Sequence, residues 1–481
     1  FSNSRNVEAK QLAKQVRTSV RKDKEAYYNQ KALELEIAHS TGDTKRLFQI
    51  VSSISGKFRV PVSETIKDKN GISFSNEAHR IEEWRTYFEE LHNRPSPPHM
   101  NNVQAKVKTT KDNHEINAGP PIMAEIIKAI KQLKNGKAPG NDGIPAELYK
   151  ACSPTMLTSI EKLFNKIWQD EMIPSQWENA ILIPVYKKGD RQQCKNYRGI
   201  SLLNIAYKIL EKILLSRILP ERNRRTRESQ AGFRPGYSCV DHIFSLRQVL
   251  ELRHEFRQPT YVAFLDFTAA FDSVDRKSLW KLLEEDNIPR KICSIIQALY
   301  RNTTSQIGVY NRLSDRIEIS TGVRQGSILS PILFNICMDN ILNCAFESTP
   351  CGIQLYPSGN RITDLTYADD VALLAESHKD LQEMIDRIDT EAKAIGLTLS
   401  VSKSKYITTD SNLNQPNLNI NGENIEKVKL FTYLGSQITE NGSSDGEIDC
   451  RISKARITFN SLTKFWRRKD VKKKKKIRVF N

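Results

Sequence analysis

The sequence predicts an α+β fold in which short buried strands alternate with longer helices. Two mainly apolar runs, residues 261–267 and 365–374, carry acidic residues where a strand would end or turn. Val, Leu, Tyr and Phe suit a half-buried pleated surface, whereas the segments around these runs place apolar residues at helical spacing. The length of 481 residues suggests about three domains.

The N-terminal region is predicted to be helical. Residues 5–38 contain no Gly or Pro and are rich in Lys, Glu, Gln and Ala, which is typical of a helix with most faces in solvent. Gly42 breaks this pattern, and the apolar residues within 47–54 then predict a short amphipathic helix. A third helix is expected over 75–91, with one apolar side for packing. Residues 92–118 carry several Pro and Asn residues and little apolar content, as a linker does.

The middle of the chain is predicted to hold helices around one strand. Pro121 opens a helix that runs to Leu133, and a glycine-rich loop follows over 136–143, with a plain turn as the alternative interpretation. The pattern then predicts a helix over 153–177, a strand over 180–186 and a helix over 202–219. A basic cluster follows, made of Arg222, Arg224, Arg225 and Arg227. Such a cluster suits contacts with phosphates, and a solvated loop is the alternative interpretation.

An acidic turn at Asp369 and Asp370 is the most informative feature of the sequence. Apolar residues lead up to the two carboxylates and resume directly after them, which predicts two strands joined by a tight turn. The two charges repel each other, and a divalent cation would relieve this repulsion because hard cations prefer oxygen ligands. For an isolated pair of acids, a solvated turn would be the simpler interpretation.

A further carboxylate, Asp266, lies near the end of the apolar run 261–267. A charge in such a strand is costly unless it is paired or bound to a metal, although an aspartate at a strand end can also cap the next turn. Together with Asp369 and Asp370 it would complete a carboxylate cluster. Clusters of this kind hold two Mg²⁺ ions roughly 3.5–4 Å apart in phosphoryl transfer.

Several elements are expected around these carboxylates. Asp275 can cap a helix that carries Leu279, Trp280, Leu282 and Leu283. Residues 307–310 and 316–319 resemble a strand pair. Ser330 and Pro331 begin a helix that runs to Leu342, and another helix is expected over 381–395. The strands should lie within 260–275 and 306–410, with helices packed behind them.

Composition points to a polyanionic partner. The formal net charge is +17 and the pI is near 9.4, which favours nucleic acid. A basic patch at 464–478 lies beside Phe465 and Trp466 and suits a surface that tracks a nucleic-acid backbone, with a disordered polybasic tail as the alternative. The eight cysteines are scattered, which argues against a zinc module or a disulfide framework. No apolar run reaches the ~18 residues that a membrane span needs, and the polar N-terminus shows no signal peptide.

Several motifs, in order, resemble those of reverse transcriptases. Residues 264–272 and 367–370 resemble the two metal-binding motifs of that family. The other matching segments are 196–204 and 230–236 for the fingers, 322–331 for the loop and helix that contact the nucleotide, 396–405 for the motif after the catalytic hairpin, and 431–435 for the primer grip. The particular residues in these motifs resemble those of reverse transcriptases from non-LTR (LINE-type) retrotransposons of an RTE- or Jockey-like clade. The segment Lys134–Ile144 is a further hallmark of that group. The resemblance runs from about residue 120 to 440.

The resemblance implies a right-hand polymerase with a ferredoxin-like palm, helical fingers and a partial helical thumb. The implied division is a helical N-terminal extension over 1–91, the linker over 92–118, fingers over 119–259, a palm over 260–410, a primer-grip region over 411–440 and a partial basic thumb over 441–481.

The resemblance also implies RNA-directed DNA synthesis, with template RNA, primer or target DNA and dNTP as partners and no membrane. Two Mg²⁺ ions, or Mn²⁺ in their place, would be held by Asp266, Asp369 and Asp370. The alternative is a catalytically inactive nucleic-acid-binding remnant.

Individual roles are carried over from the matching motifs. The implied residues are Lys403 for catalysis, Arg198, Arg234, Phe267, Phe271, Gln325 and Gly326 for the nucleotide, Tyr433, Leu434 and Gly435 for the primer grip, and Arg224, Arg225, Arg467, Arg468 and Lys472 for nucleic acid. Phe271 matches the family's sugar-gating aromatic, and Lys403 matches the lysine thought to protonate the pyrophosphate. Ser400 stands where the family usually has Asn, which departs from the motif of Lys403.

The resemblance further leads us to expect that this chain is a fragment of a longer polyprotein. The chain begins with Phe1 rather than Met, and an endonuclease domain is expected upstream. The expected location is intracellular, in the nucleus for target-primed synthesis and in the cytoplasm as a ribonucleoprotein.

Overall fold

The computed structural model describes residues 2–55, 63, 65–68, 71–74, 76–97, 116–346, 351–355, 359, 361–410, 415–468 and 471–480. The chain divides into two compact units, one made of residues 1–60 and 445–481 and the other of residues 61–444. The predicted linker, 92–118, lies mostly outside the described residues.

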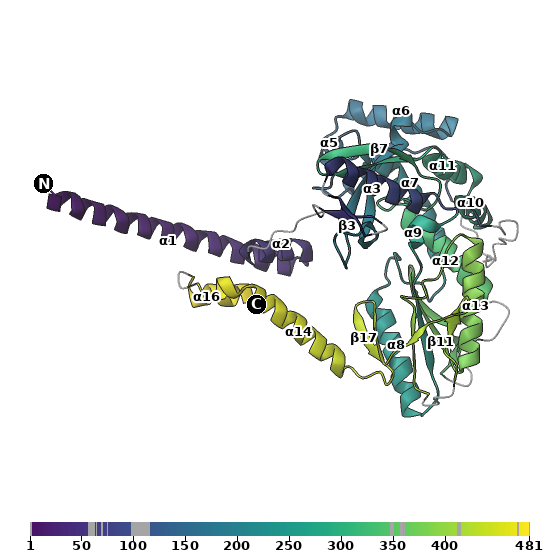
Figure 1. Cartoon of the computed structure of the whole chain (residues 1–481). Coiled ribbons are helices and arrows are strands. Elements are labelled where there is room, and N and C mark those ends of the chain that lie inside the picture. Colours follow the sequence, from purple (N-terminus) through teal and green to yellow (C-terminus); the bar gives the residue numbers. More distant parts are fainter. Residues whose placement is uncertain are drawn as a thin grey trace. The chain divides into compact units, whose positions relative to one another are not determined.

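The first unit is helical and joins the two ends of the chain. Its helices are α1 (Ser2–Ser40), α2 (Thr44–Ser55), α14 (Asp445–Ser461), α15 (Thr463–Trp466) and α16 (Lys473–Phe480) (Figure 1). The two N-terminal helices and their break at 41–43 are as predicted. Tyr28 contacts Phe465, with ring centroids 5.3 Å apart, and Arg478 donates to Glu36 at 2.6 Å. The N-terminal 60 residues therefore belong with the basic C-terminal segment and not with residues 61–91.

A five-stranded sheet forms the centre of the second unit. Its strands, in spatial order, are β10 (Asp364–Tyr367), β11 (Asp370–Ala375), β5 (Tyr261–Leu265), β12 (Lys405–Thr408) and β15 (Glu426–Lys427). The first four strands pair antiparallel, and helices follow β5 and β11 along the chain, so these elements have the β-α-β-β-α-β connectivity of ferredoxin-like folds. The predicted fold class, α+β with a ferredoxin-like palm, is confirmed.

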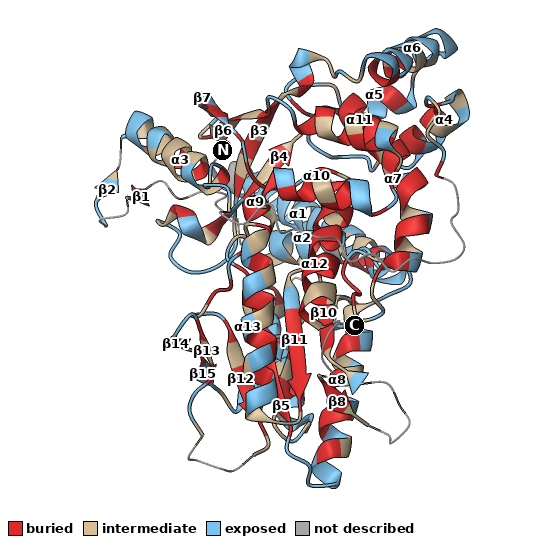
Figure 2. Cartoon of the chain, turned by 90° about the vertical axis from the view of Figure 1, so that its right-hand side faces the viewer, coloured by how far each residue is buried: buried red, intermediate tan, exposed pale blue. Residues whose placement is uncertain are grey.

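Both faces of this sheet are covered. Alternate residues of β5 point to opposite faces: Ala263 and Leu265 join the core that includes α12 (Ser330–Phe346) and α13 (His378–Ala394), whereas Val262 and Phe264 join a second core. The second core includes α8 (Cys239–Glu255) and the hairpin β16–β17 (Leu430–Tyr433 and Ser436–Thr439). Figure 2 shows β5 and β11 as mainly buried, and of the residues in these two strands only Asp370, at the start of β11, is exposed. Burial on both faces explains why these strands read as continuous apolar runs.

A second sheet holds the strand pair that was expected in the palm. Its order is β4 (Tyr197–Leu202), β3 (Asn179–Tyr186), β6 (Thr304–Val309) and β7 (Arg312–Glu318). The pair β6–β7 therefore extends the sheet of the predicted fingers, because β6 bonds to β3 and not to the carboxylate-bearing sheet. Helix α3 (Glu77–His92) packs on this sheet through Trp84 and Phe88, both fully buried.

The remaining elements frame the two sheets. The other helices are α4 (Met123–Lys131), α5 (Ala146–Lys150), α6 (Pro154–Asp170), α7 (Ile205–Arg225), α9 (Ala270–Ser273), α10 (Arg276–Glu285) and α11 (Arg290–Tyr300). The short strand pairs are β1–β2 (Ile66–Lys67 and Ser73–Phe74), β8–β9 (Ile353–Gln354 and Arg361–Ile362) and β13–β14 (Asn419–Ile420 and Glu423–Asn424). The helix predicted over 153–177 ends early, because Glu171 adopts a left-handed conformation before Pro174.

Candidate active site

The central sheet brings the three predicted carboxylates together. Strands β10 and β11 form a hairpin in which Tyr367 pairs with Asp370, so Asp369 lies in the two-residue turn. Leu265 pairs with Val371 on the neighbouring strand, and Asp266 follows Leu265 directly. Asp266 and Asp370 are therefore neighbours at the same end of adjacent strands. Two segments about a hundred residues apart in sequence thus present their acids at one edge of the sheet.

The charges of the three acids act on one another. Burial raises the pKa of Asp369, and the charge of Asp266 raises it further. Partial burial, followed by the charges of Asp369 and Asp266, raises the pKa of Asp370 to about 6. The site therefore favours a positive charge among these oxygens.

That positive charge is supplied here by Lys403, whose Nζ lies 2.8 Å from Oδ1 of Asp266. The ammonium stands where a metal cation would neutralise the carboxylate. Among the described residues, no group of three or more His, Cys, Asp and Glu side chains is arranged to enclose a metal ion. The donor set itself is suitable, because three mutually repelling carboxylates offer the oxygen ligands that Mg²⁺ prefers.

Two further cations lie near the acids. The pKa of Lys187 is lowered by partial burial and then by Arg198, and Asp369 acts on it in the opposite direction. Arg198 is exposed on β4, and Lys187 follows β3 directly. Sequence analysis predicted Arg198 but did not identify Lys187 as a candidate. Its position straight after an apolar strand that pairs with the Arg198 strand is the signal that could have identified it.

The loop that carries Gln325 and Gly326 is held against β4. The amide of Ser201 donates to the carbonyl of Gln325 at 2.7 Å. Gly326 has φ +122°, and a Cβ atom at this position would overlap the carbonyl oxygen of Ser201. Ser327 donates to the buried Glu211 of α7, which also accepts from the amide of Ile328 at 2.9 Å. Two elements, β4 and α7, therefore fix this loop.

The two predicted aromatic residues differ in exposure. Phe271 is half-buried and stacks on Phe334 of α12, with ring centroids 4.5 Å apart. Phe267 has only 3% of its surface exposed and belongs to the main core. The prediction that Phe267 contacts the nucleotide is therefore wrong for its side chain, because the ring is packed inside the protein.

A brace behind the acidic turn was missed by sequence analysis. Gln230 is fully buried, and its Oε1 accepts from the amides of Ala368 and Gly232 at 2.9 and 2.8 Å. The segment approaches so closely that a Cβ on Gly232 would overlap the backbone of Ala368. The Gln-Ala-Gly part of the fingers motif thus supports the carboxylate hairpin, a contact that local sequence patterns cannot reveal.

Arg234 has a structural role in this conformation. Its guanidinium donates to the carbonyls of Asn223 and Arg227 at 2.8 and 2.9 Å. It also lies over the ring of Tyr237, 4.0 Å from the centroid. These contacts brace the loop and contradict the prediction that Arg234 is presented to the triphosphate.

The predicted basic cluster is largely an internal ion network. Arg222 and Arg225 are buried at the end of α7, where Arg222 pairs with Asp286 and Asp339, and Arg225 pairs with Glu221. Arg227 pairs with Asp364. The prediction that Arg225 contacts nucleic acid is wrong for this reason. Arg224 is the exposed member, with its guanidinium 3.5 Å from Glu221.

The C-terminal candidates lie in the helical unit. Arg467 is exposed, Arg468 lies over the ring of Tyr28 at 5.2 Å, and Lys472 pairs with Glu25 at 3.0 Å. Within the basic patch, α15 (Thr463–Trp466) and α16 (Lys473–Phe480) are helical, whereas Arg467, Arg468 and Lys472 lie between these helices.

The predicted primer-grip residues form the turn of β16–β17. Tyr433 is buried, and its hydroxyl donates to the carbonyl of Leu365 at 2.8 Å, which ties the hairpin to β10. Its ring therefore cannot touch a primer, and the prediction for Tyr433 is corrected. Leu434 and Gly435 make the turn itself, and Gly435 is exposed.

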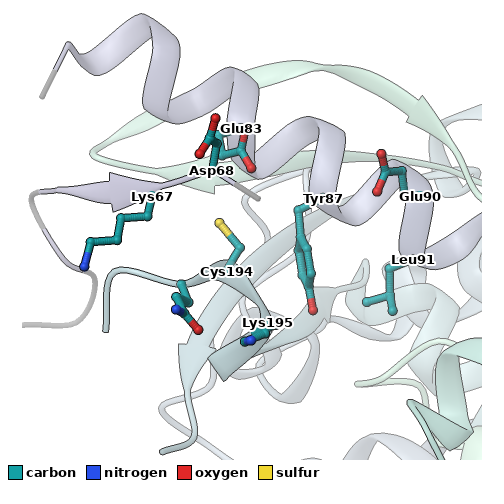
Figure 3. A pocket seen from close by; sticks show the side chains of 9 residues that line it. Lys67, Asp68, Glu83, Tyr87, Glu90, Leu91, Cys194 and Lys195 are labelled. Atoms are coloured by element: carbon teal, nitrogen blue, oxygen red, sulfur yellow. The ribbon is translucent and has the colours of Figure 1, made fainter. Parts of the chain in front are cut away.

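A separate cavity of about 450 Å³ lies beside α3 (Figure 3). Its lining includes Tyr87 of α3, Cys194 and Lys195, and not the three carboxylates. Burial raises the pKa of Tyr87 to about 12, and the next contribution is the charge of Asp272, so the inner side of α3 lies near that aspartate. Among the described residues, no helix is both long and apolar enough to cross a membrane.

Comparisons with known proteins agree with this geometry. The family model described as reverse transcriptase (RNA-dependent DNA polymerase) matches residues 185–438, just over half of the chain. Similar curated proteins include the Pol polyprotein of the type-1 retrotransposable element R2 of Nasonia vitripennis, 27% identical over 68% of this chain and 30% of that protein. Two Drosophila melanogaster proteins also match. They are a probable RNA-directed DNA polymerase from transposon BS, 28% identical over 54% of this chain and 28% of that protein, and the RNA-directed DNA polymerase from mobile element jockey, 24% identical over 65% and 34%.

These matches confirm the resemblance to LINE-type reverse transcriptases. The chain spans about a third or less of the length of these three relatives. Among solved structures, an apo telomerase of Candida tropicalis truncated from its C-terminal domain matches with a TM-score of 0.40 and 15% identity, over 62% of this chain and 60% of that chain.

Proposed function

Because this chain belongs to the reverse transcriptase (RNA-dependent DNA polymerase) family, we propose that it extends a DNA primer on an RNA template. The observation that carries the proposal is the edge of the central sheet where Asp266 lies beside the Asp369–Asp370 turn, with basic residues around it. In the reaction, the primer 3′-hydroxyl oxygen bonds to the α-phosphorus of a dNTP. The bond from that phosphorus to pyrophosphate breaks.

Reverse transcriptases generally use divalent metals, and Asp266, Asp369 and Asp370 would hold them here. Bound Mg²⁺, or Mn²⁺, would stabilise the charge that develops on the attacking and leaving oxygens. The carboxylates supply the negative environment that makes this binding favourable. Lys403 would then leave Asp266, with its ammonium available to the departing pyrophosphate.

The basic and loop residues would bind the nucleotide. Lys187 and Arg198 lie close enough to Asp369 to influence its pKa, and cations in that position suit the triphosphate. Gln325 and Gly326 would line the site from the loop on β4. Phe271 would lie beneath the sugar.

The template and primer would contact exposed basic residues. Arg224, Arg467, Arg468 and Lys472 are the candidates that remain, and Leu434 and Gly435 would approach the primer from the hairpin turn. The resemblance of the sequence motifs extends the proposal to an endonuclease domain upstream in the full-length protein and to target-primed synthesis in the nucleus.

Primer extension tests the proposal directly. With poly(rA)/oligo(dT), dTTP and Mg²⁺, the chain should extend the primer, and Asp369→Asn should reduce incorporation to background while template binding persists. Asp380→Asn is the matched control, because Asp380 is exposed in the first turn of α13 and lies outside the site. Extension by the Asp369→Asn protein at a rate near that of the unmodified chain would refute the assignment.

A further inference from the structure

We propose that Asp272 is a positioning residue that fixes which atom of the Gln325 amide faces the incoming nucleotide. The inference rests on the proposed polymerase function, and it gives a role to a buried carboxylate that the reaction described above does not use. Asp272 lies in α9, with 7% of its surface exposed.

The geometry between the two side chains is specific. Nε2 of Gln325 lies 2.7 Å from Oδ1 and 2.8 Å from Oδ2 of Asp272. An ionised carboxylate only accepts hydrogen bonds, so the NH₂ group of the amide must face it. The carbonyl oxygen Oε1 must then point the other way. No described residue donates a hydrogen bond to Oε1 of Gln325, so this acceptor remains available to a ligand.

The two partners are held in register by their backbones. The amide of Val323 donates to the carbonyl of Phe271 at 2.7 Å, and the amide of Gly322 donates to Val274 at 2.8 Å. The loop before Gln325 therefore runs alongside the segment that contains Asp272. The backbone of Gln325 is also fixed by Ser201, and the two contacts with Asp272 hold the end of its side chain.

Helix α3 closes the space behind Asp272. Nδ1 of His92 lies 4.0 Å from Oδ1 of Asp272, and this nitrogen has no hydrogen-bond partner among the described residues. The carbonyl of His92 accepts from the amide of Thr321 at 2.9 Å, next to the loop. The end of α3 thus keeps the carboxylate buried, where its hydrogen bonds to Gln325 meet little competition from water.

The fixed amide has a chemical consequence. An acceptor oxygen repels the phosphate oxygens of a nucleotide and bonds only to a donor, such as a sugar hydroxyl or a base amino group. Asp272 would therefore select the orientation in which Gln325 recognises a donor of the nucleotide, without touching the nucleotide itself.

A double-mutant cycle tests this indirect role. In Asp272→Asn the side chain keeps its size but offers both a donor and an acceptor, so the Gln325 amide can reverse. Asp272→Asn and Gln325→Ala should each lower kcat/KM for dNTP about tenfold, mainly through KM, which is the upper range for loss of one hydrogen bond. The double variant should lose no more than Gln325→Ala alone, because Asp272 acts through Gln325.

Asp275→Asn is the matched control. Asp275 is also buried, but it caps α10 by accepting from the amide of Ser278 at 2.8 Å. Asp275→Asn should lower the melting temperature. Any change that it makes in kcat/KM should add to the change caused by Gln325→Ala, because the two side chains do not contact each other.

The outcomes separate this inference from the proposed function. Additive losses for Asp272→Asn and Gln325→Ala in folded proteins would overturn the positioning role even if the unmodified chain extends primers. The same cycle is measured on the Kd of dTTP with a dideoxy-terminated primer on poly(rA), where no chemistry occurs. If the chain binds dTTP but does not extend the primer, the polymerase proposal is refuted. The Kd values of the variants would still show whether Asp272 acts through Gln325. A chain that binds no dTTP would refute both.

Discussion

Replacing Gly326 by Ala should disable the nucleotide-binding loop without unfolding the protein. The position has φ +122°, which side chains other than hydrogen rarely tolerate, and the cost of such strain is about 1–3 kcal/mol. The new Cβ would also lie well inside the 3.0 Å that real Cβ atoms keep from other heavy atoms, against the carbonyl oxygen of Ser201. Both atoms belong to backbone, so rotation of a side chain cannot relieve the overlap, and the loop must move on the order of 1 Å. A displacement of that size in a reacting geometry costs about a hundredfold in rate.

The assay is kcat/KM for dTTP in primer extension, measured beside the melting temperature. Gly136→Ala is the control, because Gly136 also has a positive φ, +65°, but a Cβ there meets nothing within 4 Å. The control should show kinetics like those of the unmodified chain. If Gly326→Ala retained the original kcat/KM, the loop against β4 would not position the nucleotide.

Two further predictions concern Phe271 and Glu211. Phe271→Val should reduce the preference for dCTP over CTP by roughly tenfold to a hundredfold, because it removes the ring beneath the sugar. The preference is measured as the ratio of the two kcat/KM values. An unchanged ratio would mean that Phe271 only packs against Phe334. Burial raises the pKa of Glu211 from 4.5 to about 7, so the folded protein favours the protonated carboxyl. As the pH rises from 4.5 to 7, the free energy of unfolding should therefore fall by up to about 3 kcal/mol. Urea denaturation at pH 5 and pH 8 should show a smaller pH dependence for Glu211→Gln, and equal dependence in both proteins would contradict this account.

The elements nearest the chemistry could be predicted from sequence because their signals are local. The strand before Asp266 is buried on both faces and reads as an apolar run, and the buried parts of β10 and β11 read as apolar residues on both sides of the Asp369–Asp370 turn. Asp275 caps its helix as expected, because a cap depends on residues three positions apart.

What could not be predicted depends on contacts between distant segments. Arg222 is buried against Asp286 and Asp339, which lie more than sixty residues away in the sequence. From the sequence alone, such a buried and paired arginine cannot be distinguished from an arginine that binds phosphate. The pair β6–β7 has the pattern of any half-buried hairpin, and only its bonds to β3 assign it to the other sheet. Lys187 was missed for a similar reason, since its partners come from other strands.

The negative charges of the three carboxylates explain why Lys403 pairs with Asp266. Asp266 lies beside two carboxylates whose pKa values are raised, so one more positive charge near it lowers the energy of all three. Lys403 meets this need because the backbone of Ser400 bonds to that of Asp266 at 2.8 Å, which brings the 400–404 turn against the end of β5. A divalent cation would meet the same need with twice the charge and with oxygen ligands on several sides. On the proposed function, Lys403 would leave Asp266 when these carboxylates hold a cation, and its ammonium would then be available to protonate the departing pyrophosphate.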